Sequence, residues 1–334
     1  MLVEKFNKAL ADASSTAQDS YLVQLSRAVK AVNDKLHAEP ELQVFASKLS
    51  DLLDQPNFGV SPHLTNKFAQ TLGEAHFWIL SLGKGVPLTR IPEERNRKTP
   101  DFKYIKGDKP YFFEVKTLSV VGGDDGIAEA LDSSLDAQID LESQRKAGAS
   151  VAMATSEAMP YGDKVGHDKP VSGTINTLLE KIRGNIKADQ FANPNTFLVV
   201  NLSIIPPFTT EPKALRPAYP DDYQFPKAIT GELWSVAFGQ RGMPILGNPE
   251  FEGKPCVEEI FDKCGILMEE EYADVAGLLF MVHPWQRPSE IWGLFRSADV
   301  SAYQDSQSTL LEVAMDLTGE LWNDCTDTNG WRLK

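Results

Sequence analysis

A polar turn at residues 106–109, Lys-Gly-Asp-Lys, separates two short segments of alternating apolar and polar residues at 101–105 and 111–118. Alternation with a period of two, interrupted by a short turn that contains glycine, is typical of a β-hairpin. If the turn is centred between its glycine and its aspartate, strand pairing is symmetric about that point, and Asp101 lies opposite Glu114. The sequence therefore predicts two carboxylates side by side on one face of a sheet.

A third ionisable residue, Lys116, falls on the same predicted face. Side chains alternate along a strand, so Lys116 points with Glu114, whereas Val115 between them points toward the core. Like charges about 5 Å apart destabilise a sheet unless a positive charge lies between them. Mg²⁺ prefers oxygen ligands and takes few of them from a protein. Candidate ligands are thus the carboxylates of Asp101 and Glu114 and the backbone carbonyl of Val115.

Apolar periodicity predicts further elements on both sides of the hairpin. A helix is expected at 63–82, where apolar residues recur at steps of three or four. A short strand is expected at 86–91, a helix at 174–187, and a buried strand at 196–205. The expected order along this part of the chain is therefore helix, three strands, helix, strand.

The segment TPDFKYIKGDKPYFFEVKT resembles the signature of the PD-(D/E)xK nuclease superfamily, in which Pro-Asp is followed, after a variable gap, by Asp/Glu-x-Lys. Here Pro100-Asp101 is followed by Glu114-Val115-Lys116. The family core also runs helix, three strands, helix, strand, and many members carry a glutamate on the first helix, in the place that Glu74 occupies. The resemblance covers about 63–205. It implies a restriction-endonuclease-like α/β fold, a mixed sheet flanked by helices.

The same resemblance implies roles for the motif residues. Asp101 and Glu114 would bind Mg²⁺, with Mn²⁺ as an alternative ion, and Glu74 would support the metal directly or through water. Lys116 would orient or help to deprotonate the attacking water. A bound divalent cation polarises a phosphoryl group and lowers the pKa of its water. The implied activity is endonucleolytic hydrolysis of phosphodiester bonds, with DNA favoured over RNA as the substrate.

Glycine and proline divide the chain into three predicted regions. Residues 1–55 are nearly free of both, and residues 1–60 are expected to form an N-terminal helical region. Residues 61–205 are the predicted nuclease core, interrupted by an insertion at 119–170. Residues 206–334 begin with a proline-rich stretch and are expected to extend the sheet or to form an accessory region. Additional elements are expected as a helix at 127–146, strands at 275–283 and 291–295, and a closing helix at 309–322.

Basic residues near the motif are candidate contacts for phosphate groups. Arg95, Arg97 and Lys98 precede Asp101, and Lys181 lies on the helix expected at 174–187. Each of them has an alternative interpretation as an ordinary solvated charge, because charged side chains are mostly exposed. The motif has its own alternative, in which Glu114 and Lys116 are only the polar edge of a half-buried strand.

The charge of the chain restricts how it binds polyanions. It contains 33 Lys and Arg against 47 Asp and Glu, a net charge of −14, so nucleic acid must bind a local basic patch and an anionic membrane is not an expected partner. No segment approaches the roughly 18 consecutive apolar residues of a membrane span. The 3 cysteines lack a C-x-x-C spacing and suit a reducing compartment. We expect a cytoplasmic protein, and a homodimer stays open.

Two other functions remain open from the sequence. One is a non-catalytic interaction protein that keeps a nuclease-like core as a scaffold, which the net negative charge favours. The intact set of Asp101, Glu114 and Lys116 argues against it. The other is a metal phosphoesterase that acts on small nucleotides, which needs no positive groove for DNA.

Overall fold

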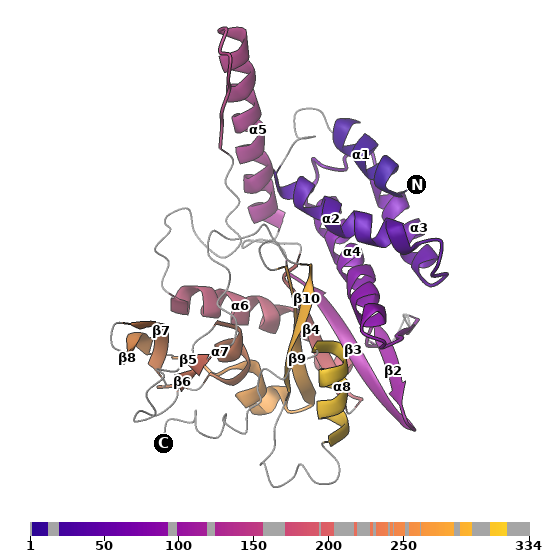
Figure 1. Ribbon diagram of the computed structural model, residues 1–334, viewed down its shortest axis with the longest axis vertical. Coiled ribbons are helices and arrows are strands. Elements are labelled where there is room, and N and C mark those ends of the chain that lie inside the picture. Colours follow the sequence, from indigo (N-terminus) through magenta and orange to yellow (C-terminus); the bar gives the residue numbers. More distant parts are fainter. Residues whose placement is uncertain are drawn as a thin grey trace. The chain divides into compact units, whose positions relative to one another are not determined.

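The computed structural model describes residues 2–12, 20–92, 99–118, 124–155, 171–193, 195–203, 217–218, 228–229, 232–239, 241–242, 244–250, 254–260, 262–283, 288–295 and 308–318. The chain is an α/β protein with a six-stranded mixed sheet (Figure 1). The chain divides into two compact units. The first comprises 1–79, 117–164 and 204–206, and the second comprises 80–116, 165–203 and 207–334. The predicted boundaries near residues 60 and 205 stay predictions.

The first unit is helical. It contains α1 (Leu2–Asp12), α2 (Ser20–Lys35), α3 (Leu42–Leu53), α5 (Asp124–Lys146) and most of α4 (Pro62–Gly83). Helix α1 packs against α2 and α3, and Phe6 stacks on Phe68 of α4 with ring centroids 5.7 Å apart. Phe58 meets Phe68 edge to face at 5.2 Å. The helices predicted in 1–60 and at 63–82 are confirmed, because their apolar spacing buries one face of each helix.

The second unit contains the sheet, whose strands lie in the order β1-β2-β3-β4-β9-β10. Strand β1 pairs antiparallel with β2, and β2 pairs antiparallel with β3. Strand β4 pairs parallel with β9, and β9 pairs antiparallel with β10. The strands are β1 (Thr89–Arg90), β2 (Phe102–Lys106), β3 (Lys109–Thr117), β4 (Thr196–Asn201), β9 (Val275–Val282) and β10 (Glu290–Phe295). Every residue of β4 is buried, as expected for a strand with neighbours on both sides and both faces covered.

Helices and short hairpins accompany the sheet in this unit. The helices are α6 (Val171–Asn185), α7 (Glu232–Phe238), α8 (Ser308–Thr318) and the 3₁₀-helices η2 (Ala188–Phe191), η4 (Ile266–Met268) and η5 (Glu270–Tyr272). The hairpins are β5 (Pro217–Ala218) with β6 (Ala228–Ile229), and β7 (Pro244–Glu250) with β8 (Lys254–Ile260). Helix α6 packs against α7, and α8 packs against β10. At that contact a Cβ on Gly293 would meet Thr318 Cγ2 at 2.7 Å, so glycine permits the close approach.

Several predicted boundaries need correction. The strand expected at 86–91 is reduced to Thr89–Arg90, since Pro87 lacks the N–H that a sheet ladder needs. The strand expected at 196–205 ends at Asn201. Strand β3 begins at Lys109, before the expected start at Tyr111. Hairpin β7–β8 was not predicted because its sequence is rich in glycine, proline and asparagine, which are uncommon in strands.

Other predicted elements are present with small shifts. The helices expected at 127–146, 174–187 and 309–322 appear as α5, α6 and α8, and the strands expected near the C-terminus appear as β9 and β10. Most of the proline-rich stretch lies outside the described residues. Among the described helices, none is long and apolar enough to cross a lipid bilayer.

Candidate active site

The β2–β3 hairpin presents the motif residues. Its two-residue connection begins with Gly107 at φ 61°, a left-handed value that glycine adopts without strain at the first central position of a type II′ turn. The register pairs Phe102 with Phe113 and Lys106 with Lys109, as the sequence predicts. Phe113 is fully buried and stacks on Phe197 of β4, with ring centroids 5.6 Å apart. The core therefore fixes one face of the hairpin and leaves the alternate face for the polar residues.

Glu114 and Lys116 form an ion pair on that alternate face. Lys116 Nζ lies 2.5 Å from Glu114 Oε1, and the Glu114 side chain is only 3% exposed. Burying a carboxylate costs free energy unless a cation and hydrogen-bond donors compensate it. This carboxylate is therefore held in a low-dielectric setting, where interactions with a bound cation are strong.

Asp101 reaches the same part of β3 from the start of β2. The regular strand begins one residue later, at Phe102, so the strand expected from Asp101 starts after it. The Asp101 amide still donates to the carbonyl of Phe113 at 3.0 Å. Its carboxylate Oδ2 accepts a hydrogen bond of 2.8 Å from the amide of Val115, the residue after Glu114. The structure thus brings Asp101 to the backbone between Glu114 and Lys116.

Sequence reasoning missed Gln190, which is part of the same cluster. Gln190 lies on η2 and is 6% exposed, and its Nε2 donates a hydrogen bond to Glu114 Oε1. The sequence predicts the hairpin from its alternation of apolar and polar residues. No pattern in the sequence links the segment of η2 to β3. The link comes from tertiary structure, because the carbonyl of Asn195 accepts a hydrogen bond of 3.1 Å from the amide of Phe112.

A second missed residue is Lys103. It pairs across the hairpin with Phe112, and cross-strand partners point to the same face. Phe112 lies two residues before Glu114, so Lys103 shares the face of Glu114 and Lys116. The alternation starting at Asp101 was a signal that could have identified it. Lys103 adds a positive charge along the path from the motif to the hairpin tip.

The remaining predicted residues divide into three groups. Glu74 is half-buried on α4 and belongs to the first compact unit, whereas the hairpin belongs to the second, so its role at the metal stays a prediction. Arg95, Arg97 and Lys98 lie outside the described residues. Lys181 is half-buried on α6, and burial lowers the pKa of its ammonium group to about 8.

The donor set suits a hard divalent cation. The described residues contain no group of three or more His, Cys, Asp or Glu arranged to hold a metal ion. Asp101 and Glu114 supply carboxylate oxygens, and the buried Oε1 of Gln190 has no hydrogen-bond partner within the described part of the chain. Carboxylate and amide oxygens are ligands that Mg²⁺ accepts, and Mg²⁺ keeps several waters when protein ligands are few. The cluster therefore fits Mg²⁺ better than Zn²⁺, which prefers nitrogen and sulfur ligands.

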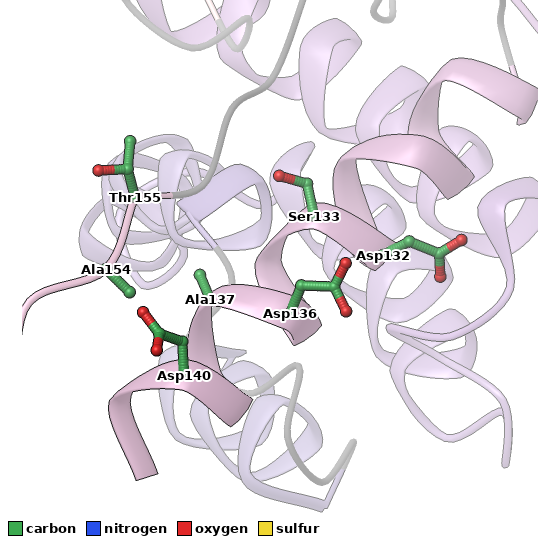
Figure 2. A pocket seen from close by; sticks show the side chains of 7 residues that line it. All are labelled: Asp132, Ser133, Asp136, Ala137, Asp140, Ala154 and Thr155. Atoms are coloured by element: carbon green, nitrogen blue, oxygen red, sulfur yellow. The ribbon is translucent and has the colours of Figure 1, made fainter. Parts of the chain in front are cut away.

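A second feature of the described residues is an acidic pocket outside the motif. It lies along α5 and is lined by Asp132, Asp136 and Asp140, with Ala154 and Thr155 across from them (Figure 2). The three aspartates recur every four residues and therefore share one face of the helix. Their negative charge disfavours a phosphate ligand. We assign no function to this pocket.

Comparisons with known proteins give no relative for this chain. No family model matches it, no curated protein matches it, and no solved structure matches it. The chemistry must therefore be argued from the residues of the site.

Proposed function

We propose that the protein is a metal-dependent nuclease that hydrolyses phosphodiester bonds of nucleic acid, with DNA as the favoured substrate. One observation carries the proposal: Asp101 is hydrogen-bonded to the amide of Val115, directly between Glu114 and its ion-pair partner Lys116. Two carboxylates and a lysine, one carboxylate just before β2 and the other two groups on β3, are the components that cation-assisted phosphodiester hydrolysis needs. The element order of the hairpin, α6 and β4 also agrees with the PD-(D/E)xK resemblance.

Each residue has a defined chemical task in this proposal. Asp101 and Glu114 would hold Mg²⁺, which would polarise the phosphoryl group and lower the pKa of a bound water. The Val115 amide fixes the Asp101 carboxylate, so that its orientation does not depend on the substrate. Lys116 Nζ supplies a positive charge beside the carboxylate and stabilises negative charge that develops on the phosphoryl oxygens. Lys103, on the same face, would contact a substrate phosphate.

The scaffold function is the second candidate. The net charge of −14 favours it, because a binding module for protein partners needs no positive groove. The Lys116–Glu114 ion pair also compensates the buried carboxylate without any cation. The two functions predict different results for Asp101→Ala. A nuclease would lose cleavage in this variant, whereas a scaffold would keep its partner binding.

The experiment incubates the protein with supercoiled, linear and single-stranded DNA and with RNA, in Mg²⁺, Mn²⁺ or EDTA. We expect cleavage that requires the cation and falls by orders of magnitude in Lys116→Ala. Lys263→Ala is the matched control, since Lys263 is also ion-paired, to Glu180, but lies away from the motif in sequence and on a different segment. Mononucleotides and a small phosphodiester serve as substrates for the phosphoesterase alternative. Absence of cleavage of every substrate, with partner binding unchanged in Asp101→Ala, would establish the scaffold function instead.

A further inference from the structure

The side chain of Gln190 has one polar atom bonded to the motif and one polar atom left open beside it. Its Nε2 donates to Glu114, a carboxylate that the proposed nuclease uses for the cation. Its Oε1 is buried and has no hydrogen-bond partner among the residues that the structure describes, although buried polar atoms are nearly always paired. An acceptor in this position costs free energy unless a water or a cation occupies the adjacent space. The side chain therefore points to a ligand of positive or hydrogen-bond-donating character.

The fold holds Gln190 in this position from both sides. Phe191, the next residue, is 3% exposed and anchors η2 in the core. The amide of Gln190 donates to the carbonyl of Lys187 at 2.9 Å, which closes the 3₁₀ turn. After η2 the chain is tied to β3 by the hydrogen bond from Phe112 to Asn195, and Asn195 adopts a left-handed φ of 67°. Gln190 is thus fixed by backbone contacts that do not involve Glu114.

We infer that Gln190 is a further residue of the cation site, and this inference rests on the proposed nuclease function. Its amide Nε2 positions the Glu114 carboxylate, and its Oε1 would accept a hydrogen bond from a water of the bound cation. A coordinating carboxylate is commonly oriented by an outer hydrogen-bond donor, and loss of such a donor typically lowers metal affinity 10–100-fold. The neutral amide adds an oxygen to the site without adding a third negative charge to be compensated.

The test measures Mn²⁺ binding by titration calorimetry, independently of any cleavage. Gln190→Met keeps the approximate size of the side chain and removes both polar atoms. We expect its Mn²⁺ affinity to fall at least about tenfold. The control is Gln55→Met, because Gln55 is exposed and its side-chain Nε2 donates to the backbone carbonyl of Asp51 in the first unit. Wild-type affinity in Gln190→Met would overturn the inference.

A second variant keeps the inference testable if Gln190→Met does not fold. Gln190→Glu retains the length of the side chain and places a carboxylate beside Glu114. Repulsion between the two should lower the melting temperature in EDTA, whereas Mn²⁺ should stabilise this variant more than the wild type. An equal increase in melting temperature on adding Mn²⁺ in both proteins would overturn the inference.

The proposed function and the inference fail in different ways. If the wild type binds Mn²⁺, Asp101→Ala does not, and Gln190→Met binds normally, the cation site stands and the role of Gln190 is wrong. If the wild type binds no Mn²⁺, both the cation site and the role of Gln190 are wrong.

Discussion

The carboxylate of Asp101 accepts a 2.8 Å hydrogen bond from the backbone amide of Val115, so a side chain at the start of β2 is locked to the strand that carries Glu114 and Lys116. The bond fixes the orientation of the Asp101 carboxylate within the fold. Asp101 therefore has two properties that substitution can test in turn. Asparagine removes only its charge, whereas alanine removes both its charge and its capacity to accept a hydrogen bond.

Asp101→Asn should bind cation poorly yet fold normally. The asparagine carbonyl oxygen can still accept from the Val115 amide, but the charge that attracts the cation is lost. We expect a fall in Mn²⁺ affinity of about tenfold or more, comparable to that in Asp101→Ala. The alanine variant should in addition lose about 1 kcal/mol of stability, since a hydrogen bond is removed. Calorimetric titration and thermal unfolding measure the two effects, and normal Mn²⁺ binding by Asp101→Asn would contradict the cation site.

Lys116→Met should make stability depend more strongly on Mg²⁺. Removing the lysine leaves the buried Glu114 carboxylate without its ion-pair partner, and breaking a buried pair typically costs about 3–5 kcal/mol. A bound cation replaces the missing charge, so Mg²⁺ should raise the melting temperature of Lys116→Met more than that of the wild type. Differential scanning calorimetry with Mg²⁺ and with EDTA measures this difference. The prediction fails if Mg²⁺ stabilises both proteins equally.

Lys181→Met should stabilise the protein at neutral pH. Burial lowers the pKa of Lys181 from 10.5 in the unfolded chain to about 8, so the folded state binds fewer protons between these two values. The free energy of unfolding of the wild type therefore rises with pH from about 8 to about 10.5. Below about pH 8 the folded state bears the whole cost of burying the charged Lys181 ammonium group.

The substitution removes that penalty, so the melting temperature should rise at pH 7 and the advantage should shrink toward pH 10.5. Lys187→Met is the control, because Lys187 is exposed just after the same helix. A gain in stability that does not change with pH would assign the effect to apolar packing instead. Weaker DNA binding by Lys181→Met at low salt would support the predicted phosphate contact.

Gly265→Ala should destabilise the protein strongly, and Gly184→Ala should not. A Cβ on Gly265 would lie 2.5 Å from the backbone carbon of Ala237 at the end of α7, where no side-chain movement can relieve the overlap. A Cβ on Gly184 in α6 meets nothing within 4 Å, so alanine there should add up to about 1 kcal/mol through helix propensity. Urea unfolding of both variants measures the contrast, which a stable Gly265→Ala would contradict.

The sequence was most informative where the determinants are local. Alternation around a glycine turn was enough to predict the β2–β3 register, because a hairpin brings together residues that are close in the chain. It also placed Glu114 and Lys116 on one face, where the ion pair forms. Apolar spacing similarly predicted α4 and α6, since burial of one helix face follows the helical period. The β7–β8 hairpin was missed because its glycine and proline content gives no strand signal.

What the sequence alone determined is therefore the hairpin, its register and the shared face of Glu114 and Lys116. Only the tertiary structure decided that β4 lies beside β3 and pairs in parallel with β9, a partner far away in the chain. It also decided that Gln190 meets Glu114. Such pairings depend on how distant apolar surfaces pack together, and neither alternation nor spacing within a short segment encodes that choice of partner.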